Sequence, residues 1–296
     1  MNILIGFLFV AIFYGGLMGL WWNLQTVLMK DGISPYLVRM ISGFMAGILL
    51  IPLSFLVYGV PNFSVAFLGS ICVAIGLNVV IAYCFVAAAQ KNGAAIGSHV
   101  QVFGPIVSLF VGKMLLSEFP NVIGILGMFI TLIGLYFFQK GPIKKMFLEW
   151  KSWLGYAVLL AFCSGFAVPF DKINILLTNS MLAPGLTLFF GWGMFYLFAY
   201  IVANKKKKQV IIWNRKTVLS MILLGLFFGV ANMFQGLAYK LVPTAAMVGV
   251  LKRTDGLWTV LFCLTLFKQN SKPFRVIGAV IIFVGLVIMG LSNFVK

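Results

Sequence analysis

The sequence predicts an all-α integral membrane protein of ten transmembrane helices, arranged as two inverted five-helix repeats. Its 296 residues are 62% hydrophobic and 9% charged, with a mean hydropathy of +1.09. Soluble domains carry about 25% charged residues, so most of this chain is expected to lie in lipid. The chain also divides into apolar segments of about 20 residues, the length that crosses a hydrocarbon core of about 30 Å. Basic residues, finally, gather in alternate connections.

Charges, prolines and Asn/Gly clusters mark the ends of the ten segments. The first five helices are expected near Ile3–Met29, Pro35–Tyr58, Phe63–Gln90, Ala94–Leu116 and Pro120–Phe138. The second five are expected near Trp153–Thr178, Pro184–Ala203, Thr217–Lys240, Thr244–Phe267 and Pro273–Leu291. This division predicts a first repeat at 1–140, a basic cytoplasmic connector at 141–152 and a second repeat at 153–296. Because each repeat has an odd number of helices, the second must lie upside down relative to the first.

The placement of lysine and arginine predicts the orientation, because basic residues in short loops stay on the cytoplasmic side. Fifteen of the 22 basic residues fall in alternate connections. Lys240 and Lys296 fall on the other side, and the remainder lie within helices: Arg39, Lys113, Lys172, Lys252 and Arg253. We therefore expect a multi-pass protein of the cell (inner) membrane with both termini non-cytoplasmic.

The two halves also share a pattern of small residues. A shift of 151 residues lays Ala94 and Ala95 on Ala245 and Ala246. The same shift lays the glycine pair Gly127 and Gly134 on Gly278 and Gly285. The pattern indicates an internal repeat, and inverted repeats of transporters bind substrate near the midplane between the halves.

Several of these residues resemble a known family. The stretch 91–95, with Pro105, Glu118 and the helix that carries Gly127 and Gly134, resembles the end of an EamA repeat of the drug/metabolite transporter superfamily. The stretch 238–246 with the helices after it resembles the same pattern, with Gln269 where the family usually has Glu. The resemblance implies a bundle of five plus five helices, alternating access, and export or exchange of amino acids, metabolites, sugar derivatives or drugs.

Charged residues inside the predicted spans are candidate functional groups, because each is costly in lipid unless paired or hydrated. At about 1.5 Å per residue, Lys252 lies about 13 Å inside from Pro243, and Asp171 about 10 Å inside from Thr178. Both distances start at the outer face, so the two clusters are expected at similar depth, for example with Asp171 paired to Arg253. The candidate binding residues of these clusters are Asp171, Lys172, Lys252, Arg253 and Asp255.

Three cations against two carboxylates leave one positive charge, which favours a carboxylate or phosphate as ligand. The alternative is a structural ion network that fixes helix packing. Gln101 corresponds to Lys252 in the repeat, and nearby His99 is a candidate proton-coupling group because it titrates near physiological pH. Further candidates offer aromatic faces and hydrogen bonds to a ligand: Trp21, Trp22, Asn23, Asn78, Tyr83, Trp192, Tyr196, Asn232 and Gln235.

The function expected from these residues is secondary transport, as exporter or exchanger, of a small metabolite that is favoured to be anionic. An amino-acid or drug/cation exporter, with the charges as scaffold, is one alternative, and a channel-like pore or a lipid-precursor flippase is another. An enzyme is not expected, because the chain has one His, five acids and none of the common hydrolase motifs. We expect no metal, cofactor or nucleic acid; the expected partners are a small-molecule substrate and membrane lipid, in a monomer or homodimer.

Overall fold

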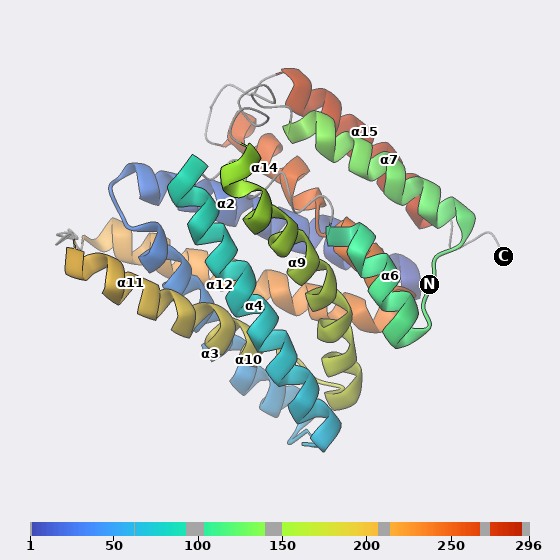
Figure 1. The fold of residues 1–296 in the computed structure, drawn as a ribbon, viewed down its shortest axis with the longest axis horizontal. Helices are drawn as coiled ribbons and strands as arrows, with labels where there is room; N and C mark the ends of the chain where they lie inside the picture. The colour runs from blue at the N-terminus through green and yellow to red at the C-terminus, as the bar shows by residue number, and fades with distance from the viewer. Residues whose placement is uncertain are drawn as a thin grey trace.

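The computed structural model describes residues 2–61, 63–92, 104–139, 150–206, 214–266 and 273–291, and within them all regular structure is helical (Figure 1). The elements of the first half are α1 (Asn2–Leu8), η1 (Phe9–Tyr14), α2 (Gly15–Lys30), α3 (Pro35–Tyr58), α4 (Val65–Asn92), α6 (Gly104–Leu116) and α7 (Val122–Gln139). Those of the second half are α9 (Trp150–Thr178), α10 (Leu182–Leu186), η3 (Thr187–Met194), α11 (Phe195–Lys206), α12 (Arg215–Leu241), α13 (Ala245–Leu251), α14 (Thr254–Thr265) and α15 (Pro273–Leu291).

Within the described part of the chain, six helical segments are long and apolar enough to cross a membrane. They are Ile3–Lys30, Pro35–Tyr58, Val65–Cys84, Val158–Thr178, Leu182–Asn204 and Arg215–Leu241. Shorter apolar helices cover Gly104–Leu116, Val122–Gly134 and Val276–Met289. A multi-pass membrane protein follows from these lengths and compositions.

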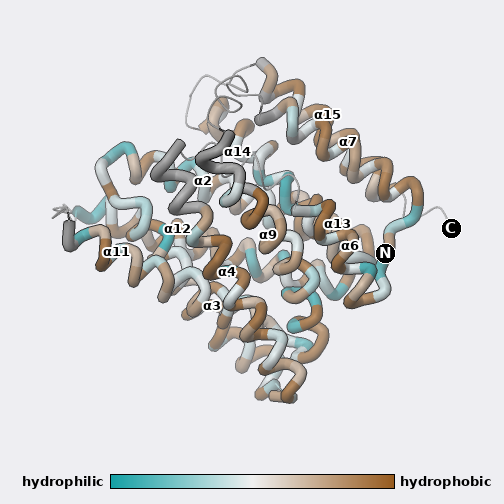
Figure 2. Tube along the Cα trace, in the orientation of Figure 1, coloured by the Kyte–Doolittle hydropathy of each residue, from teal (hydrophilic) through white to brown (hydrophobic). Residues whose placement is uncertain are grey.

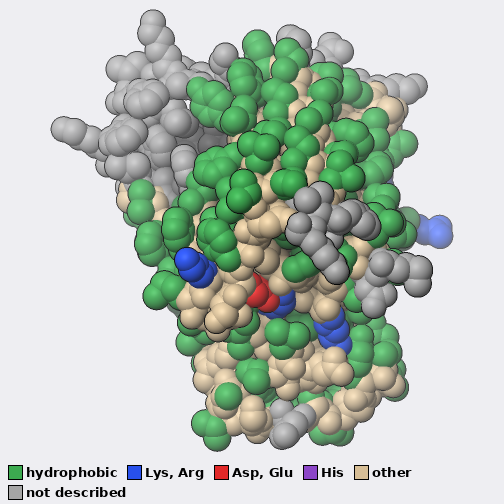
Figure 3. Space-filling view, turned by 90° about the vertical axis from the view of Figure 1, so that its right-hand side faces the viewer, with side chains coloured by type: hydrophobic (Ala, Val, Ile, Leu, Met, Phe, Trp, Pro, Cys, Tyr) green, Lys and Arg blue, Asp and Glu red, His purple; other side chains and the backbone are tan. Residues whose placement is uncertain are grey.

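The exterior of the bundle is apolar and part of the interior is polar. Leu56, Val65, Met114 and Val122 are each more than four-fifths exposed, and Figure 2 shows hydrophobic residues along the outer helices. Buried polar residues include Ser42, Asn174 and Gln235. On the face drawn in Figure 3, the charged side chains lie in a band beneath a broad hydrophobic area. This distribution suits a lipid solvent, because apolar surface has no cost there and polar groups do.

Several helix ends meet at one end of the bundle. The Lys240 ammonium donates to the Asn179 backbone oxygen at 2.7 Å and lies 4.6 Å from the centroid of the Tyr58 ring. The backbone N–H of Ala245 donates to Glu118 Oε2 at 2.9 Å. The first contacts join the ends of α3, α9 and α12, and the last joins the α6–α7 connection to the start of α13. Figure 1 draws both chain termini on the side of the α6–α7 connection.

Helices α7 and α15 pack against each other through glycines (Figure 1). A Cβ atom on Gly127 would lie 2.8 Å from the Gly285 carbonyl oxygen, and one on Gly134 would lie 2.9 Å from the Gly278 carbonyl oxygen. The two backbones are therefore close enough that only glycine fits, as is common where membrane helices associate.

The helix expected at Thr244–Phe267 is interrupted, which corrects the sequence prediction. It is helical as α13 and again as α14, with a turn at Lys252 and Arg253 between them. At the turn the Thr254 hydroxyl donates to the Leu251 carbonyl at 2.9 Å, and the Gly256 N–H donates to Asp255 Oδ1 at 2.8 Å. Such side-chain bonds to nearby backbone compete with the regular helical pattern, which apolar periodicity cannot reveal.

Most other helix ends lie close to the expected positions. Pro35–Tyr58 and Pro273–Leu291 have the expected bounds, and α9 continues through Pro169. Two differences stand out: residues 150–152, assigned to the connector, already belong to α9, and 94–103 of the expected fourth helix lie outside the described residues. Wider helical turns at η1 and η3 were not anticipated, and such π-helical turns often occur at functional sites.

Candidate functional site

A cavity of about 150 Å³ lies inside the bundle. Its walls come from η1, α2, α3, α4, α6, α9, α10, η3, α12, α13 and α14, so both halves of the chain contribute. Helices α7 and α15 contribute no lining residue among those described. Both π-helical turns reach the cavity, through Tyr14 of η1 and through Thr187, Leu188 and Trp192 of η3.

The interruption between α13 and α14 brings charged groups to the cavity. Lys252 and Arg253 occupy the turn, Asp255 begins α14, and Asp171 faces them from α9. Asp171 interacts electrostatically with Lys252, and Asp255 interacts mainly with Arg253. The pairing of Asp171 with Arg253 that the sequence suggests stays a prediction. The two cations and two carboxylates therefore form one balanced cluster.

Two further groups hold this cluster in place. The Trp22 indole N–H donates to Asp255 Oδ2 at 3.1 Å. The Lys252 ammonium lies 5.7 Å from the centroid of the buried Tyr14 ring, within the range of a cation–π contact. Trp22 and Tyr14 both belong to the first helical segment. Charged groups of the second half of the chain therefore contact aromatic groups of the first half.

A second polar group lies on α3, α4, η3 and α11. Arg39 of α3 lines the cavity, and its Nη1 donates to the Tyr196 hydroxyl at 3.0 Å. The Arg39 guanidinium lies 5.7 Å from the centroid of the same ring. Close by in sequence to Tyr196, the Trp192 indole N–H donates to Asn78 Oδ1 at 2.9 Å. These contacts hold the arginine against α11 and the Asn78 amide against η3.

Aromatic rings join the two polar groups. Trp22 packs edge-on against Trp21 at 4.7 Å between ring centroids, and Trp21 stacks on Phe228 at 5.2 Å. Phe228 in turn contacts Trp192 at 5.6 Å. All four rings line the cavity, so a continuous aromatic wall runs from Asp255 to Asn78.

Most of the residues expected at the site do line this cavity. They are Trp22, Asn78, Asp171, Asn232, Gln235, Lys252, Arg253 and Asp255, together with Trp21 and Trp192. Tyr83 does not, because its half-exposed ring packs at 6.2 Å from that of Tyr156 on the outside. Asn23 and Tyr196 also lie outside the lining, the first bound to the Gly19 and Thr259 carbonyls. Gln101 and the proton-coupling candidate His99 lie outside the described residues.

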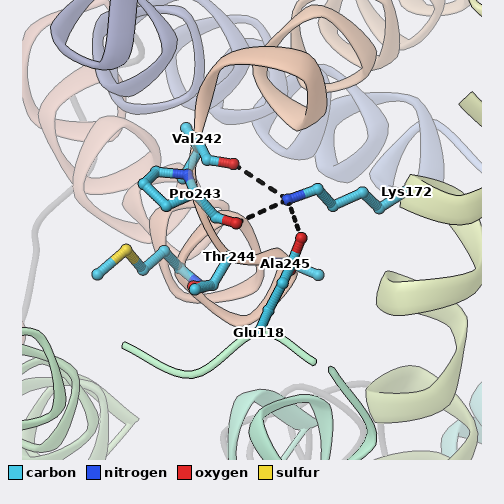
Figure 4. A network of polar contacts seen from close by, with 7 residues as sticks. Glu118, Lys172, Val242, Pro243, Thr244 and Ala245 are labelled. Atoms are coloured by element: carbon cyan, nitrogen blue, oxygen red, sulfur yellow. Dashed lines mark hydrogen bonds and ion pairs between the residues drawn. The ribbon is translucent and has the colours of Figure 1, made fainter. Parts of the chain in front are cut away.

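Lys172 requires a correction, because its side chain leaves the cavity. Its ammonium lies 2.5 Å from Glu118 Oε1 and donates to the Val242 and Pro243 carbonyls at 3.2 and 2.9 Å (Figure 4). On a helix, neighbouring residues point in directions about 100° apart. When Asp171 faces the cavity, Lys172 must therefore face elsewhere, and here it meets the α6–α7 and α12–α13 connections.

Arg39 and Tyr14 were missed as site residues. The argument that selected Lys252 also applies to Arg39, since it is a cation inside a predicted span. Arg39 lines the cavity and Lys172 does not, so the described charges of the cavity are again three cations and two carboxylates. Tyr14 gave no comparable signal in the sequence. In the described residues no group of three His, Cys, Asp or Glu could hold a metal ion.

Comparison with known proteins shows a similar fold and no matching family. No protein-family model matches the chain, and no curated protein matches it. A structure described only as "Crystal structure of protein" is similar to it, with a TM-score of 0.71 and 14% sequence identity over 97% of this chain and 94% of that chain. The shared fold thus extends over nearly the whole chain, and the resemblance to the drug/metabolite transporter superfamily stays a prediction from the sequence.

Proposed function

We propose that this protein is a secondary transporter, an exporter or exchanger, that carries a small anionic metabolite across the cell membrane by alternating access. The observation that supports this best is the cavity between the halves, whose described lining has three cations and two carboxylates. An anion entering it neutralises the surplus charge in surroundings where charge is poorly screened. Carboxylate and phosphate both suit the planar fork of arginine.

The interrupted helix supports the same proposal. In secondary transporters, the substrate and coupling-ion sites are typically formed by discontinuous helices near the bilayer midplane. Here Lys252 and Arg253 occupy the interruption itself, and Lys252 is about 13 Å along the helix from Pro243. A cation at that depth is costly in lipid and is a functional candidate by default.

The proposed architecture is ten helices in two inverted repeats, and the glycine contacts support it. The 151-residue shift exchanges Gly127 with Gly278 and Gly134 with Gly285, so it maps the Gly127–Gly285 contact onto the Gly134–Gly278 contact. Two contacts that are exchanged by the same shift in this way are the signature of a two-fold relation. Two inverted halves of this kind can rock about a fixed site.

A second pair of contacts repeats the pattern at the start of each half. A Cβ on Gly15 would meet Trp258 at 2.8 Å, and one on Gly165 would meet the Val107 side chain. The glycines differ by 150 residues and their partners by 151. Each half therefore packs its first helix against the fourth helix of the other half in the same way.

The size of the cavity bears on the substrate. A dry cavity of about 150 Å³ accepts a molecule the size of benzene, so in this conformation the site suits a small metabolite and is too small for a nucleotide sugar. The proposed cycle begins when a small anion binds between the helix interruption and α3. The halves then rock, and the site opens to the other side. The balanced cluster of Asp171, Lys252, Arg253 and Asp255 moves with α9 and the interrupted helix.

A ligand screen by thermal stabilisation tests the proposal, because a ligand that binds the folded state raises its melting temperature without any knowledge of coupling or direction. The panel contains amino acids, organic phosphates, carboxylates, nucleotide sugars and quaternary amines. We expect small anions alone to stabilise the purified protein. Stabilisation by amines or neutral amino acids alone would instead favour the amino-acid or cation exporter with the charges as scaffold.

Flux in proteoliposomes separates a transporter from a pore. A transporter saturates with substrate and exchanges it against substrate on the other side, since each crossing needs a conformational change. For any anion found in the screen, we expect uptake that saturates and is accelerated by the same anion inside. Flux that rises in proportion to concentration, without exchange, would indicate a channel.

A further inference from the structure

The Lys172–Glu118 ion pair joins the two halves of the chain at one end of the bundle (Figure 4). Glu118 follows α6 of the first half, and Lys172 lies on α9 of the second half. The other Glu118 oxygen accepts from the backbone N–H of Ala245, so α13 is joined to the same carboxylate. The Lys172 and Glu118 side chains are only 5% and 18% exposed. These groups must separate if the halves are to part at this end.

Asn174 lies on α9 close to this ion pair, on the face that lines the cavity. It follows Asp171 by three residues and Ala167 by seven, close to one and two helical turns. Asp171 and Ala167 both line the cavity, whereas Asn174 is fully buried and is not part of the lining. Asn174 therefore continues the cavity face of α9 towards the end at which Lys172 meets Glu118.

The Asn174 amide is buried without compensation. Its side chain is 0% exposed, and neither its oxygen nor its nitrogen has a hydrogen-bond partner within the described part of the chain. A buried polar group in this condition costs free energy that an apolar side chain of similar shape would avoid. Asparagine is thus unfavourable here in this conformation, and it is favourable in one where water or a polar substrate reaches it.

Gln235 of α12 is in a similar condition at the cavity wall. Its Nε2 donates to the Tyr239 hydroxyl at 3.2 Å, while its Oε1 is buried without a partner among the described residues. Tyr239 also lines the cavity and lies one turn further along α12, which ends at Leu241. Polar groups of α9 and α12 therefore lead from the cavity to the end that Lys172 and Glu118 hold together.

We propose that Asn174 and Gln235 line the route by which substrate passes between the cavity and the predicted non-cytoplasmic side, and that the Lys172–Glu118 ion pair is the gate that closes this route. The inference rests on the proposed function and deepens it by naming the route and its gate. Opening brings both charges of the gate into water. Their hydration offsets the attraction that they lose, because a buried ion pair is nearly balanced between desolvation and Coulomb attraction.

Neutralising Lys172 alone should favour the open conformation. In Lys172→Met, the closed conformation keeps the Glu118 carboxylate buried without its cation, which is more costly than burying the pair. Water reaches that carboxylate when the halves part. The fraction of molecules that are open at this end should therefore rise in this variant.

Cysteine labelling at position 174 measures the opening. Asn174→Cys in a chain without the four native cysteines places one thiol on the proposed route. The probe is a methanethiosulfonate that carries a sulfonate group, added from the predicted non-cytoplasmic side. We expect slow labelling in this chain, and labelling several-fold faster when Lys172→Met is added. Equal rates in the two chains would overturn the gate.

The matched control is a chain that keeps only Cys84. This thiol is also fully buried, but it belongs to α4 and does not line the cavity. Lys172→Met should leave its labelling slow. Acceleration at Cys84 equal to that at position 174 would mean that the ion pair holds the fold as a whole, which would also overturn the gate.

Asn174→Leu tests the route without a thiol at that position. Leucine keeps the branched shape and removes the uncompensated amide, so the melting temperature should stay level or rise. Labelling of Ser164→Cys in the cavity, with the same probe from the same side, should slow several-fold because the open route loses a group that water hydrates. A lower melting temperature with unchanged labelling would show a structural asparagine and overturn its place in the route.

The outcomes separate this inference from the function on which it rests. Saturable anion exchange by a protein whose position 174 is labelled equally with and without Lys172→Met would overturn the gate and leave anion transport standing. Faster labelling at position 174 in Lys172→Met, in a protein that no anion stabilises, would overturn anion transport and support the gate.

Discussion

The Lys172 ammonium lies 2.5 Å from Glu118 Oε1 and also binds the carbonyls of Val242 and Pro243. With its other oxygen, Glu118 accepts a hydrogen bond from the backbone N–H of Ala245, the first residue of α13. One ion pair thereby fastens α9 to the connections α6–α7 and α12–α13. Lys172 therefore has a structural contact with Glu118, a residue that the sequence analysis did not place with the intramembrane charges.

Lys172→Met should lower stability and leave the cavity intact. The Lys172 side chain is 5% exposed and that of Glu118 is 18% exposed, and removing one partner of a buried ion pair costs about 3 kcal/mol because the other charge is left uncompensated. Thermal unfolding in detergent measures the loss. The double variant Lys172→Met/Glu118→Gln should recover most of it. Normal stability together with lost anion binding would return Lys172 to the substrate site.

Gly127→Ala should weaken the α7–α15 contact. The added Cβ would lie 2.6 Å from the Met289 backbone nitrogen, so the helices must move apart, and overpacking of this kind costs about 1 to 3 kcal/mol. The matched control is Gly76→Ala, where nothing lies within 4 Å of the new Cβ and helix propensity alone acts, in favour of alanine. The melting temperature should fall for Gly127→Ala and should stay level or rise for Gly76→Ala. An unchanged melting temperature for Gly127→Ala would contradict the observed packing.

Asp171→Asn should strengthen anion binding. The substitution removes one of the two described carboxylates of the cavity and leaves its three cations in place. At an effective dielectric constant near 20, one unit of charge about 10 Å away changes the affinity by roughly tenfold. Titration of an anion found in the thermal-stabilisation screen measures the change. Weaker binding in this variant would mean that Asp171 itself contacts the ligand.

Both chain termini should lie on the non-cytoplasmic side. A C-terminal alkaline phosphatase fusion, which is active only outside the cytoplasm, reports the orientation. The control is a fusion placed after Asn204 at the end of α11, where the tetralysine 205–208 is predicted to be cytoplasmic. We expect the first fusion to be active and the second inactive, and the reverse pattern would show that the Lys/Arg bias misleads here.

The sequence predicted the positions of helices well, because spans are set by uninterrupted apolar length and by punctuation. It could not predict the interruption after Leu251, since the bonds of Thr254 and Asp255 that accompany it are side-chain to backbone contacts. The sequence also did not predict the direction of the Lys172 side chain. Adjacency to Asp171 suggested a shared site, whereas helical geometry separates neighbours by about 100°.

The site was predicted in outline from the cost of charge in lipid, which selected Lys252, Arg253, Asp171 and Asp255. The same rule selects Arg39, whose place in the cavity depends on how α3 packs against η3 through Gly43 and Gly193. That contact joins helices far apart in the chain, and the pattern of a single sequence does not reveal such contacts. The aromatic wall likewise unites rings from three helices far apart in the chain.

Access to Ser164, measured by cysteine labelling from each side of the membrane, tests whether the cavity opens to both sides, as alternating access requires. Ser164 lines the cavity on α9, and Ser164→Cys in a chain without its four native cysteines places one thiol there. The reagents are methanethiosulfonates that carry either a sulfonate or a trimethylammonium group and do not cross lipid. A chain with only Cys72, exposed on the outside of α4, is the control for reagent that enters lipid. We expect labelling from both sides, faster with the anionic reagent. Labelling from one side only would contradict alternating access, and faster labelling with the cationic reagent would contradict an anion site.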